Sequence, residues 1–322
     1  MGDPMNQARP PAPRRLVDRF RPATMAAGTP GFLPTLRAYS GLRVPEARFD
    51  RPTETLGRLG SLEVRLAYKA ADVRRAQKLR YRVFYQERAA VADAKTLFAR
   101  RDIDTFDAIC DHLLVVDHAL AGRMVGRRRA PVVGTYRLLR QDVAERHGGF
   151  YTAGEFEIGA LMTRHQPQRF LELGRSCVLP PYRNKRTVEL LWHGIWTYVL
   201  KHRLDVMIGC ASLDGTDPDR IALPLSFLHH YAPAPEPWRA RALPHRYVEM
   251  NRMAKEAIDP KAALRALPPL IKGYLRLGAY IGEGAVADYQ FGTTDVLIVL
   301  PVTAIKHRYI EHFGPMAERH AA

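Results

Sequence analysis

The alternation of apolar and polar side chains is clearest over residues 170–178, a predicted buried strand that carries two opposite charges. Side chains of a strand point alternately to its two faces, so Glu172, Gly174 and Ser176 are predicted to share one face. The residues predicted on the other face are Leu171, Leu173, Arg175 and Cys177. Two prolines at 180–181 end the strand, and a basic helix start follows.

The pattern on either side of this strand predicts a mixed sheet. Further strands are predicted at residues 62–67, 112–116, 132–139 and 205–211, and helices at residues 70–87 and 187–203. Three consecutive strands without a helix between them pair antiparallel, which excludes a purely doubly wound fold. We therefore expect an α/β fold with a largely antiparallel sheet flanked by helices, in which the basic segment 122–129 closes a hairpin.

The remainder of the chain is predicted as additions to this core. Helices are expected at residues 221–230 and 264–277, and a hairpin at 286–302, with a flexible glycine connection at 282–284. The proposed division is a flexible, basic, Pro- and Arg-rich arm at 1–55, a core at 56–213 and an extension of helices and a hairpin at 214–322.

Charge and composition narrow the choice of partners. The 49 Lys and Arg residues outnumber the 33 Asp and Glu residues, for a formal net charge of +16. This excess favours an anionic partner, which is nucleic acid, anionic lipid or an acidic protein, although a merely solvated basic surface stays an alternative. Nucleic acid is the least supported, because no zinc finger, aromatic RNA-binding signature or helix-turn-helix pair is found.

The apolar runs, the cysteines and the histidines of the sequence indicate where the protein is found and whether it binds a metal. No run of eighteen apolar residues or apolar signal core is found, so a cytoplasmic protein is expected. The three cysteines are widely spaced and no histidine has a partner at metal-ligand spacing, so no metal is expected.

Charged side chains inside predicted strands mark a candidate site. Arg137 lies within 132–139, and Glu172 and Arg175 lie within 170–178, while Asp104 and Asp107 belong to an acidic loop. Buried charges need partners, and such pairs occur both at functional sites and in purely structural ion-pair networks. Both interpretations stay open at this point.

Four motifs in chain order resemble those of the GNAT-fold N-acyltransferases. They are LRYRVF at 79–84, DTFD at 104–107, GTYRLL at 134–139 and ELGRSCV at 172–178. More narrowly, the chain resembles the L-ornithine N-alpha-acyltransferases that begin ornithine-lipid synthesis, and more distantly the acyl-homoserine-lactone synthases. The segments 267–279 and 291–296 also resemble the ornithine enzymes. The resemblance implies a GNAT-like fold and covers about residues 62–313.

The resemblance also implies a reaction, in which the α-amine of L-ornithine attacks an acyl thioester directly. Glu172 is the candidate base, directly or through a water, and backbone amides around Ser176 and Cys177 are candidate donors to the oxyanion. Either Arg137 or Arg175 is expected to bind the amino-acid carboxylate. The other substrate-binding candidates are Asp104 and Asp107, for the distal ammonium, and Arg80, Arg82 and Phe84.

The acyl donor is inferred from a departure from the family pattern. GNAT enzymes commonly hold the coenzyme A pyrophosphate in a glycine-containing turn, whereas this chain has RNKRTV at 183–188. A basic helix start with Arg183, Lys185, Arg186 and Thr187 suits a single phosphate. The expected donor is therefore an acyl carrier protein that brings its own phosphopantetheine, preferably with a 3-hydroxyacyl chain, and no cofactor is expected to be bound permanently.

The implied product, a lyso-ornithine lipid, suggests a place at the membrane. A basic enzyme that makes a single-chain amphiphile is expected on the inner face of the cytoplasmic membrane, with apolar residues of 272–281 as a shallow anchor. Two alternatives stay open: an enzyme like the acyl-homoserine-lactone synthases, with S-adenosylmethionine as acceptor, and a non-catalytic basic lipid-binding protein.

Overall fold

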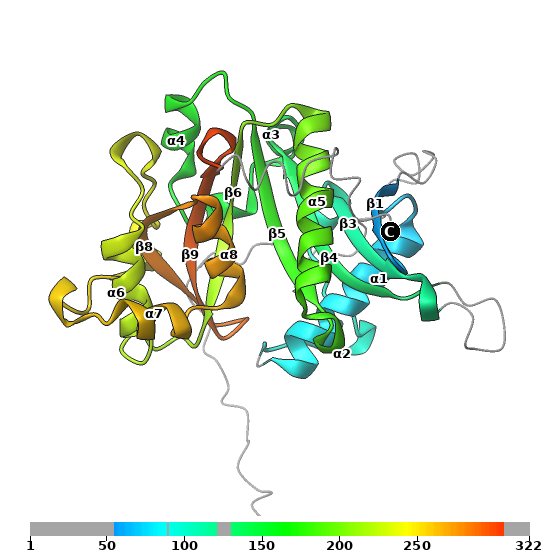
Figure 1. Cartoon of the computed structure of the whole chain (residues 1–322), viewed down its shortest axis with the longest axis horizontal. Coiled ribbons are helices and arrows are strands. Elements are labelled where there is room, and N and C mark those ends of the chain that lie inside the picture. Colours follow the sequence, from blue (N-terminus) through cyan, green and yellow to red (C-terminus); the bar gives the residue numbers. More distant parts are fainter. Residues whose placement is uncertain (1–54, 89, 121–129, 306–322) are drawn as a thin grey trace, which may run out of the picture. The chain divides into compact units, whose positions relative to one another are not determined.

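The computed structural model describes residues 55–88, 90–120 and 130–305, and these residues form one sheet of nine strands in the order β1-β2-β3-β4-β5-β6-β9-β8-β7 (Figure 1). The strands are β1 Thr55–Leu59, β2 Leu62–Leu66, β3 Asp111–Asp117, β4 Val132–Arg140, β5 Phe170–Val178, β6 Val206–Asp214, β7 Tyr247–Val248, β8 Tyr280–Asp288 and β9 Thr293–Pro301. Only the β5–β6 pair is parallel within these residues.

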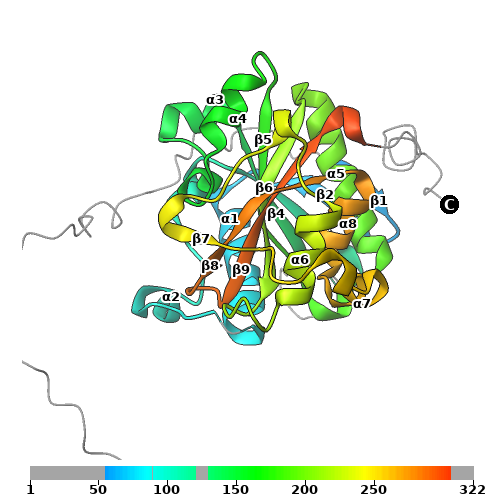
Figure 2. The same ribbon diagram turned by 90° about the vertical axis from the view of Figure 1, so that its left-hand side faces the viewer.

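Helices cover both faces of this sheet. They are α1 Ala70–Tyr81, α2 Ala94–Ala99, α3 Gln141–Ala144, α4 Ile158–Arg164, α5 Lys185–His202, α6 Ala222–Tyr231, α7 Pro260–Ala266 and α8 Pro269–Leu277. In β3, Leu113 and Val115 pack with α5, whereas Leu114 and Val116 pack with α1, as the alternation of a strand requires. The helices α6, α7 and α8 share the face of α5, and α4 lies on the face of α1 (Figure 2).

The long elements follow the predicted order of strand, helix, three strands, helix and strand. The strand β1 and the short helices α2, α3 and α4 were not predicted, and α3 and α4 lie between β4 and β5, where no helix was expected. The predicted C-terminal hairpin is β8–β9, and it joins the same sheet through β6, so the sheet continues across the boundary placed at residue 213. The predicted arm at 1–55, apart from Thr55, and the hairpin loop at 122–129 lie outside the described residues.

The helix expected at 70–87 is present, as α1 followed directly by a π-helical turn, Arg82–Glu87. Two other predictions of local structure were wrong. The helix expected at 264–277 is two helices, because Pro268 and Pro269 interrupt it and Pro269 begins α8. The glycines at 282–284 do not form a flexible linker, because they lie inside β8, at a point where its register with β9 shifts. Gly284 has a φ of 76°, and the ring of Tyr247 lies so close to it that a Cβ there would clash.

The strand β5 departs from its predicted alternation at one residue. Arg137 of β4 pairs with Gly174, and Thr135 pairs with Cys177, so Arg175 and Ser176 together lie opposite a single residue of β4. Arg175 has a φ of 49°, the conformation of a β-bulge. This extra residue reverses the alternation. Arg175 and Cys177 therefore face α1, Ser176 faces α5, and the predicted face sharing of Glu172 with Ser176 was wrong.

The strands β5 and β6 lie side by side only at their beginnings. Three pairs join Phe170–Glu172 to Val206–Ile208, and beyond them the two strands diverge (Figure 1). At the point of divergence a Cβ on Gly209 would lie 2.3 Å from the carbonyl oxygen of Leu173, so only glycine fits this close approach. The opening beyond Gly209 contains the candidate site.

No helix within the described ranges is long and apolar enough to cross a membrane. The apolar residues of 272–281, predicted as an exposed anchor, are instead mostly in the core: Tyr274, Leu277, Ala279 and Ile281 are all buried. Their burial follows from the packing of α8 against β6 and β9.

Candidate active site

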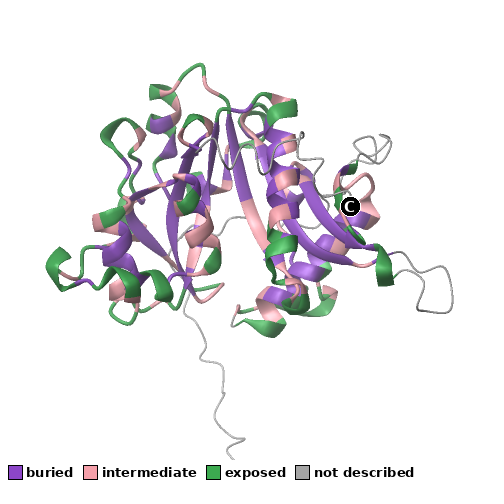
Figure 3. Ribbon diagram, in the orientation of Figure 1, coloured by how far each residue is buried: buried purple, intermediate pink, exposed green. Residues whose placement is uncertain are grey.

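A cavity of about 640 Å³ occupies the opening between the diverging strands. The second half of β5, the middle of β6, the start of α5, the face of α8 and the β8–β9 turn line it. Its floor is polar and charged, and its α8 side is largely apolar. Figure 3 shows β5 changing from buried to partly exposed at the residues that face this opening.

A buried ion-pair network forms one wall. Arg80 of α1 binds Asp107 with both of its terminal nitrogens, at 2.8 and 2.7 Å, and its Nε donates to Asp102 at 2.8 Å. The side chain of Arg80 is 1% exposed. Burial opposes ionisation of Asp107, but Arg80 outweighs it and holds the pKa of Asp107 well below its usual range. Arg80 is thus fully engaged in joining α1 to the acidic loop.

The network continues to the sheet. Arg137 of β4 donates to both carboxylate oxygens of Asp104, at 2.5 and 2.6 Å, and Arg175 of β5 donates to the same carboxylate at 3.2 Å. Three arginines and three aspartates therefore neutralise one another. Asp104 and Asp107 are occupied by arginines, so this structure gives no support to their expected role in holding a distal ammonium.

Arg175 and Arg137 both line the cavity, whereas Arg80 does not. Arg175 lies over the rings of Tyr151 and Phe291, with its guanidinium carbon 5.2 and 4.6 Å from their centres. Its Nε is buried without a hydrogen-bond partner among the described residues. Of the two predicted carboxylate clamps, the NH1 of Arg137 is committed to Asp104 and Asp107, whereas Arg175 pairs with its aspartates at longer distances, 3.5 Å for Nε to Asp102 and 3.2 Å for NH2 to Asp104.

Glu172 is buried in the cavity floor and is held on both oxygens. Its Oε1 accepts from the amide and the hydroxyl of Thr152, each at 2.6 Å, and its Oε2 accepts from the amide of Tyr151 at 3.1 Å. Burial raises the pKa of Glu172, and the hydrogen bonds from Thr152 offset only part of this effect. Glu172 therefore anchors the 3-10 helix Tyr151–Gly154 and also presents a carboxylate of raised basicity to the cavity.

Hydroxyl groups line the opposite wall, beside the bulge. The hydroxyls of Tyr136 and Tyr274 are 3.4 Å apart, and Ser176 hydrogen-bonds to Tyr136. Burial raises the pKa of both tyrosines, and it raises the pKa of Cys177 to about 12. At neutral pH these groups are neutral hydrogen-bond donors, and Cys177 is no thiolate.

The residues predicted to bind a phosphate are only partly brought together. Arg183 and Lys185 line the cavity, and Arg183 also pairs with Glu87. Thr187 is buried, with its amide satisfied by the Asn184 side chain at 3.1 Å, and the guanidinium of Arg186 lies beside Gly60 away from the cavity. Two of the four predicted residues therefore face the space where a donor could lie.

Of the remaining predicted substrate contacts, again only some line the cavity. Phe84, in the π-helical turn, lines the cavity, whereas Arg82 is exposed and does not. Sequence reasoning missed the acidic side chains Glu155, Asp288 and Asp295 and the hydroxyls of Tyr136 and Tyr274. Tyr136, Tyr274 and Asp295 all lie in segments that resemble the ornithine enzymes, but nothing in the local pattern assigned them a role.

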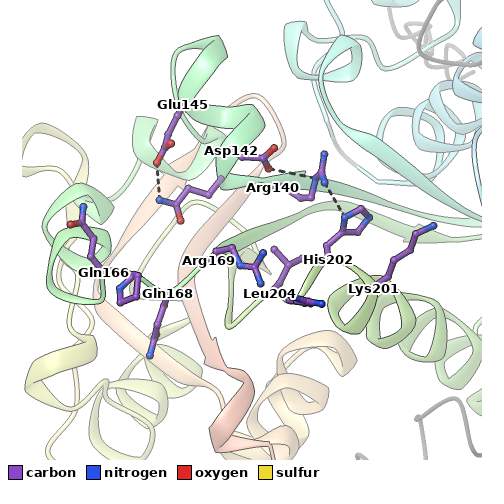
Figure 4. Close-up of a pocket in the computed structure, with 12 residues that line it drawn as sticks. Arg140, Asp142, Glu145, Gln166, Gln168, Arg169, Lys201, His202 and Leu204 are labelled. Atoms are coloured by element: carbon purple, nitrogen blue, oxygen red, sulfur yellow. Dashed lines mark hydrogen bonds and ion pairs between the residues drawn. The ribbon is translucent and has the colours of Figure 1, made fainter.

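A second cavity of about 740 Å³ lies at the far end of the strands, where β4 ends and β5 and β6 begin (Figure 4). Its charged side chains include Arg140, Arg169 and Lys201, and Arg140 contacts His202 at 2.9 Å and Asp142 at 3.6 Å. None of the predicted site residues lines it. The candidate site is therefore confined to the opening between β5 and β6.

Comparison with known proteins identifies a GNAT domain in this chain. The acetyltransferase (GNAT) domain family matches residues 79–193. An N-acyl amino acid synthase from uncultured soil microbes and the AHL synthase LasI are structurally similar, each with a TM-score of 0.41 and 11% identity. They cover 75% and 79% of this chain and 91% and 94% of their own.

Relatives found by sequence share a much higher identity with this chain. The L-ornithine N(alpha)-acyltransferase of Rhizobium meliloti (strain 1021) is 55% identical over 90% of this chain and 95% of its own length. The enzyme of that name from Agrobacterium fabrum is 54% identical over 82% of this chain and 88% of its own. An identity this high over almost the whole relative, together with the GNAT match, shows that the chain is an acyltransferase and belongs to the L-ornithine N(alpha)-acyltransferase family.

Proposed function

We propose that this enzyme transfers a 3-hydroxyacyl group from an acyl carrier protein to the α-amine of L-ornithine, which yields a lyso-ornithine lipid. The observation that carries the proposal is the division of the cavity. Arg175 and Glu172 offer charged contacts on one side of the β5 bulge, while the hydroxyl-lined wall and the apolar face of α8 lie on the other. An amino acid and an acyl thioester can thus approach each other across the bulge.

The acceptor side supplies positioning and proton removal. Arg175 binds the amino-acid carboxylate through its guanidinium, which lines the cavity and is held only at 3.2 and 3.5 Å by its aspartates. Glu172 accepts the proton of the attacking ammonium, directly or through a water. Its raised pKa brings it closer to neutral pH, where a general base works best, and its three hydrogen bonds fix its orientation.

The donor side supplies hydrogen-bond donors and a phosphate contact. Backbone amides at Ser176 and Cys177 stabilise the oxyanion, and the hydroxyls of Tyr136 and Tyr274 lie where they can donate to the departing thiolate. Arg183 and Lys185 at the start of α5 bind the single phosphate of a carrier-bound pantetheine. A carrier protein is acidic, so the net charge of +16 also favours its encounter.

Matched donors test this proposal. Initial rates are measured with the same 3-hydroxyacyl chain on an acyl carrier protein and on coenzyme A, with ornithine as acceptor. We expect a kcat/KM at least tenfold higher for the carrier-bound donor. Lys185→Glu should lower this value, and Arg186→Glu, one residue along and directed away from the cavity, should lower it less. Equal efficiency with both donors would reject the carrier-specific proposal.

The place of the enzyme is proposed to be the inner surface of the cytoplasmic membrane. The helix α2 exposes Leu97 and Phe98, which is 95% exposed, next to basic residues. The segment that precedes it contacts the β8–β9 turn, because the amide of Val91 donates to Gln290. Phe291 in that turn lines the cavity, so this apolar surface borders the space from which an acylated product would leave.

A further inference from the structure

Three carboxylates meet on the acceptor side of the cavity. Glu155 follows the 3-10 helix Tyr151–Gly154, Asp288 ends β8 and Asp295 lies in β9. One oxygen of each lies within 4.8 Å of an oxygen of the others. All three side chains are buried, with exposures of 2%, 8% and 5%, and the two aspartates line the cavity directly.

The charge of this acidic cluster is not balanced by the protein. Arg246 pairs with Glu155, its NH1 at 3.6 Å, and the charge of Arg175 acts on Asp295, but within the described ranges no ion pair reaches Asp288 or Asp295. Glu155 Oε2 is buried without a hydrogen-bond partner. Burial and the charge of Asp295 raise the pKa of Glu155 to about 7, and burial with the charge of Asp288 raises that of Asp295. Like charges held this close favour protonation of one carboxyl, and a bound cation would favour the ionised cluster instead.

We propose that the acidic cluster binds the terminal ammonium of the diamino-acid acceptor and so selects ornithine over neutral amino acids, an inference that rests on the proposed function. An alkylammonium has three N–H donors, and the cluster offers one carboxylate to each. The site expected from sequence for this group, Asp104 with Asp107, is already filled by arginines.

The spacing of the acceptor side fits a short aliphatic amino acid with charges at both ends. The ring of Tyr151 lies under the guanidinium of Arg175, and its hydroxyl donates to Glu155 at 3.4 Å. One tyrosine side chain thus spans the distance between the carboxylate contact and the acidic cluster. The backbone amide of the same residue donates to Glu172 at 3.1 Å, so Tyr151 contacts the proposed base as well.

An organic ammonium suits the cluster better than a divalent metal. Asp288 Oδ1 accepts from the amides of Gln290 and Phe291, and Asp295 Oδ1 accepts from Thr293. These bonds occupy lone pairs that a calcium or magnesium ion would need to complete six or more oxygen ligands. An ammonium needs only one lone pair from each carboxylate.

Isothermal titration of the full-length protein tests the proposal. The ligands are ornithine, 2-aminopentanoate, which has the same carbon chain without the terminal ammonium, and 1,4-diaminobutane, which lacks the carboxylate. Asp295→Asn should weaken ornithine binding at least tenfold and leave 2-aminopentanoate binding unchanged. Glu155→Gln is the second variant, and Asp217→Asn, an exposed carboxylate outside the cavity, is the control for lost charge.

The outcomes separate this inference from the proposed function. Equal ornithine affinity in wild type and Asp295→Asn, with acyl transfer intact, overturns the acidic cluster alone. Binding of 1,4-diaminobutane that Asp295→Asn abolishes, without acyl transfer to ornithine, supports the cluster and overturns the proposed function. Binding of Mg²⁺ or Ca²⁺ that depends on Asp295 and that ornithine does not compete for overturns the inference. Unlike a structural ion pair, the cluster predicts that neither variant lowers the melting temperature of the free protein.

Discussion

Arg80 holds Asp107 with two parallel hydrogen bonds, NH1 to Oδ1 at 2.8 Å and NH2 to Oδ2 at 2.7 Å, and both side chains are almost fully buried. Asp107→Asn would leave Arg80 as a partly paired buried charge. Losing one partner of such a pair costs about 3–5 kcal/mol. We therefore expect a loss of stability of that size in urea unfolding.

The matched control is Asp142→Asn, which breaks exposed pairs with Arg140 and Arg146 and should change stability by roughly 0–1 kcal/mol. If Asp107→Asn instead unfolds like the wild type but binds ornithine poorly, Asp107 is a substrate contact and the structural interpretation of the network is wrong.

The bulge in β5 allows charge and backbone conformation to be tested separately. Arg175 has a φ of 49°, which glycine adopts without the cost of about 1 kcal/mol that other residues incur. Arg175→Gly should therefore keep the strand geometry and remove only the guanidinium. We expect ornithine binding to weaken about a hundredfold, while binding of 1,4-diaminobutane, which has no carboxylate, changes little. Unchanged ornithine affinity would exclude Arg175 as the carboxylate clamp.

The same bulge shows what sequence pattern can and cannot determine. Alternation placed Leu171, Glu172 and Leu173 correctly, because each obeys the period of a regular strand. It failed from Arg175 onward, since a bulge adds one residue and is signalled only by pairing with β4, which is a property of two strands. The sheet class and the long helices α1 and α5 were predictable, because each rests on a long local period, whereas the short helices α2, α3 and α4 were missed.

The acidic cluster could not be predicted from sequence either, because its residues meet only in the folded chain. Glu155 lies more than a hundred residues before Asp288 and Asp295 in the chain, and each of the three is an ordinary acid in its own context. Only the hairpin β8–β9 and its position beside β6 bring them together. By contrast, Glu172 and Arg175 could be chosen from sequence, because a charge inside an apolar strand is unusual by itself.

The general-base role of Glu172 predicts a large kinetic effect with a small structural one. Glu172→Gln keeps the acceptor oxygen for Thr152 but cannot accept a proton, so the single-turnover rate should fall about a hundredfold or more. Thr152→Ala is the control for positioning, because it removes one hydrogen bond to Glu172 and leaves the carboxylate, and should lower the rate less than tenfold. A folded Glu172→Gln variant with normal turnover would remove Glu172 from this role.

The raised pKa of Glu155 predicts a pH dependence of known sign. Burial and Asp295 raise the pKa of Glu155 to about 7 in the folded protein, whereas a glutamate in the unfolded chain ionises near 4.3. Its contribution to stability is therefore present below about pH 4.3 and is lost as the pH rises toward about 7. The groups that face Glu155 are Tyr151, Cys210, Arg246, Asp288 and Asp295.

The melting temperature of the free protein should accordingly fall as the pH rises through this range, and Glu155→Gln should remove part of the fall. Ornithine affinity should move in the opposite direction and strengthen up to about pH 7, because the ammonium favours the ionised carboxyl. Calorimetric titrations in buffers of different ionisation enthalpy would detect the proton that Glu155 releases on binding. The same proton release from Glu155→Gln would assign it to another group.

The exposed apolar residues of α2 predict how the enzyme meets the membrane. Lysine and arginine near an anionic surface contribute about 1 kcal/mol each and are screened by salt, whereas buried apolar side chains are not. Leu97→Ser with Phe98→Ser should therefore leave binding to anionic vesicles intact at low salt but abolish the part that survives high salt. Leu264→Ser, another exposed apolar residue but on α7, is the control. Flotation measures both, and a double variant that floats like the wild type at high salt would show that α2 is no anchor.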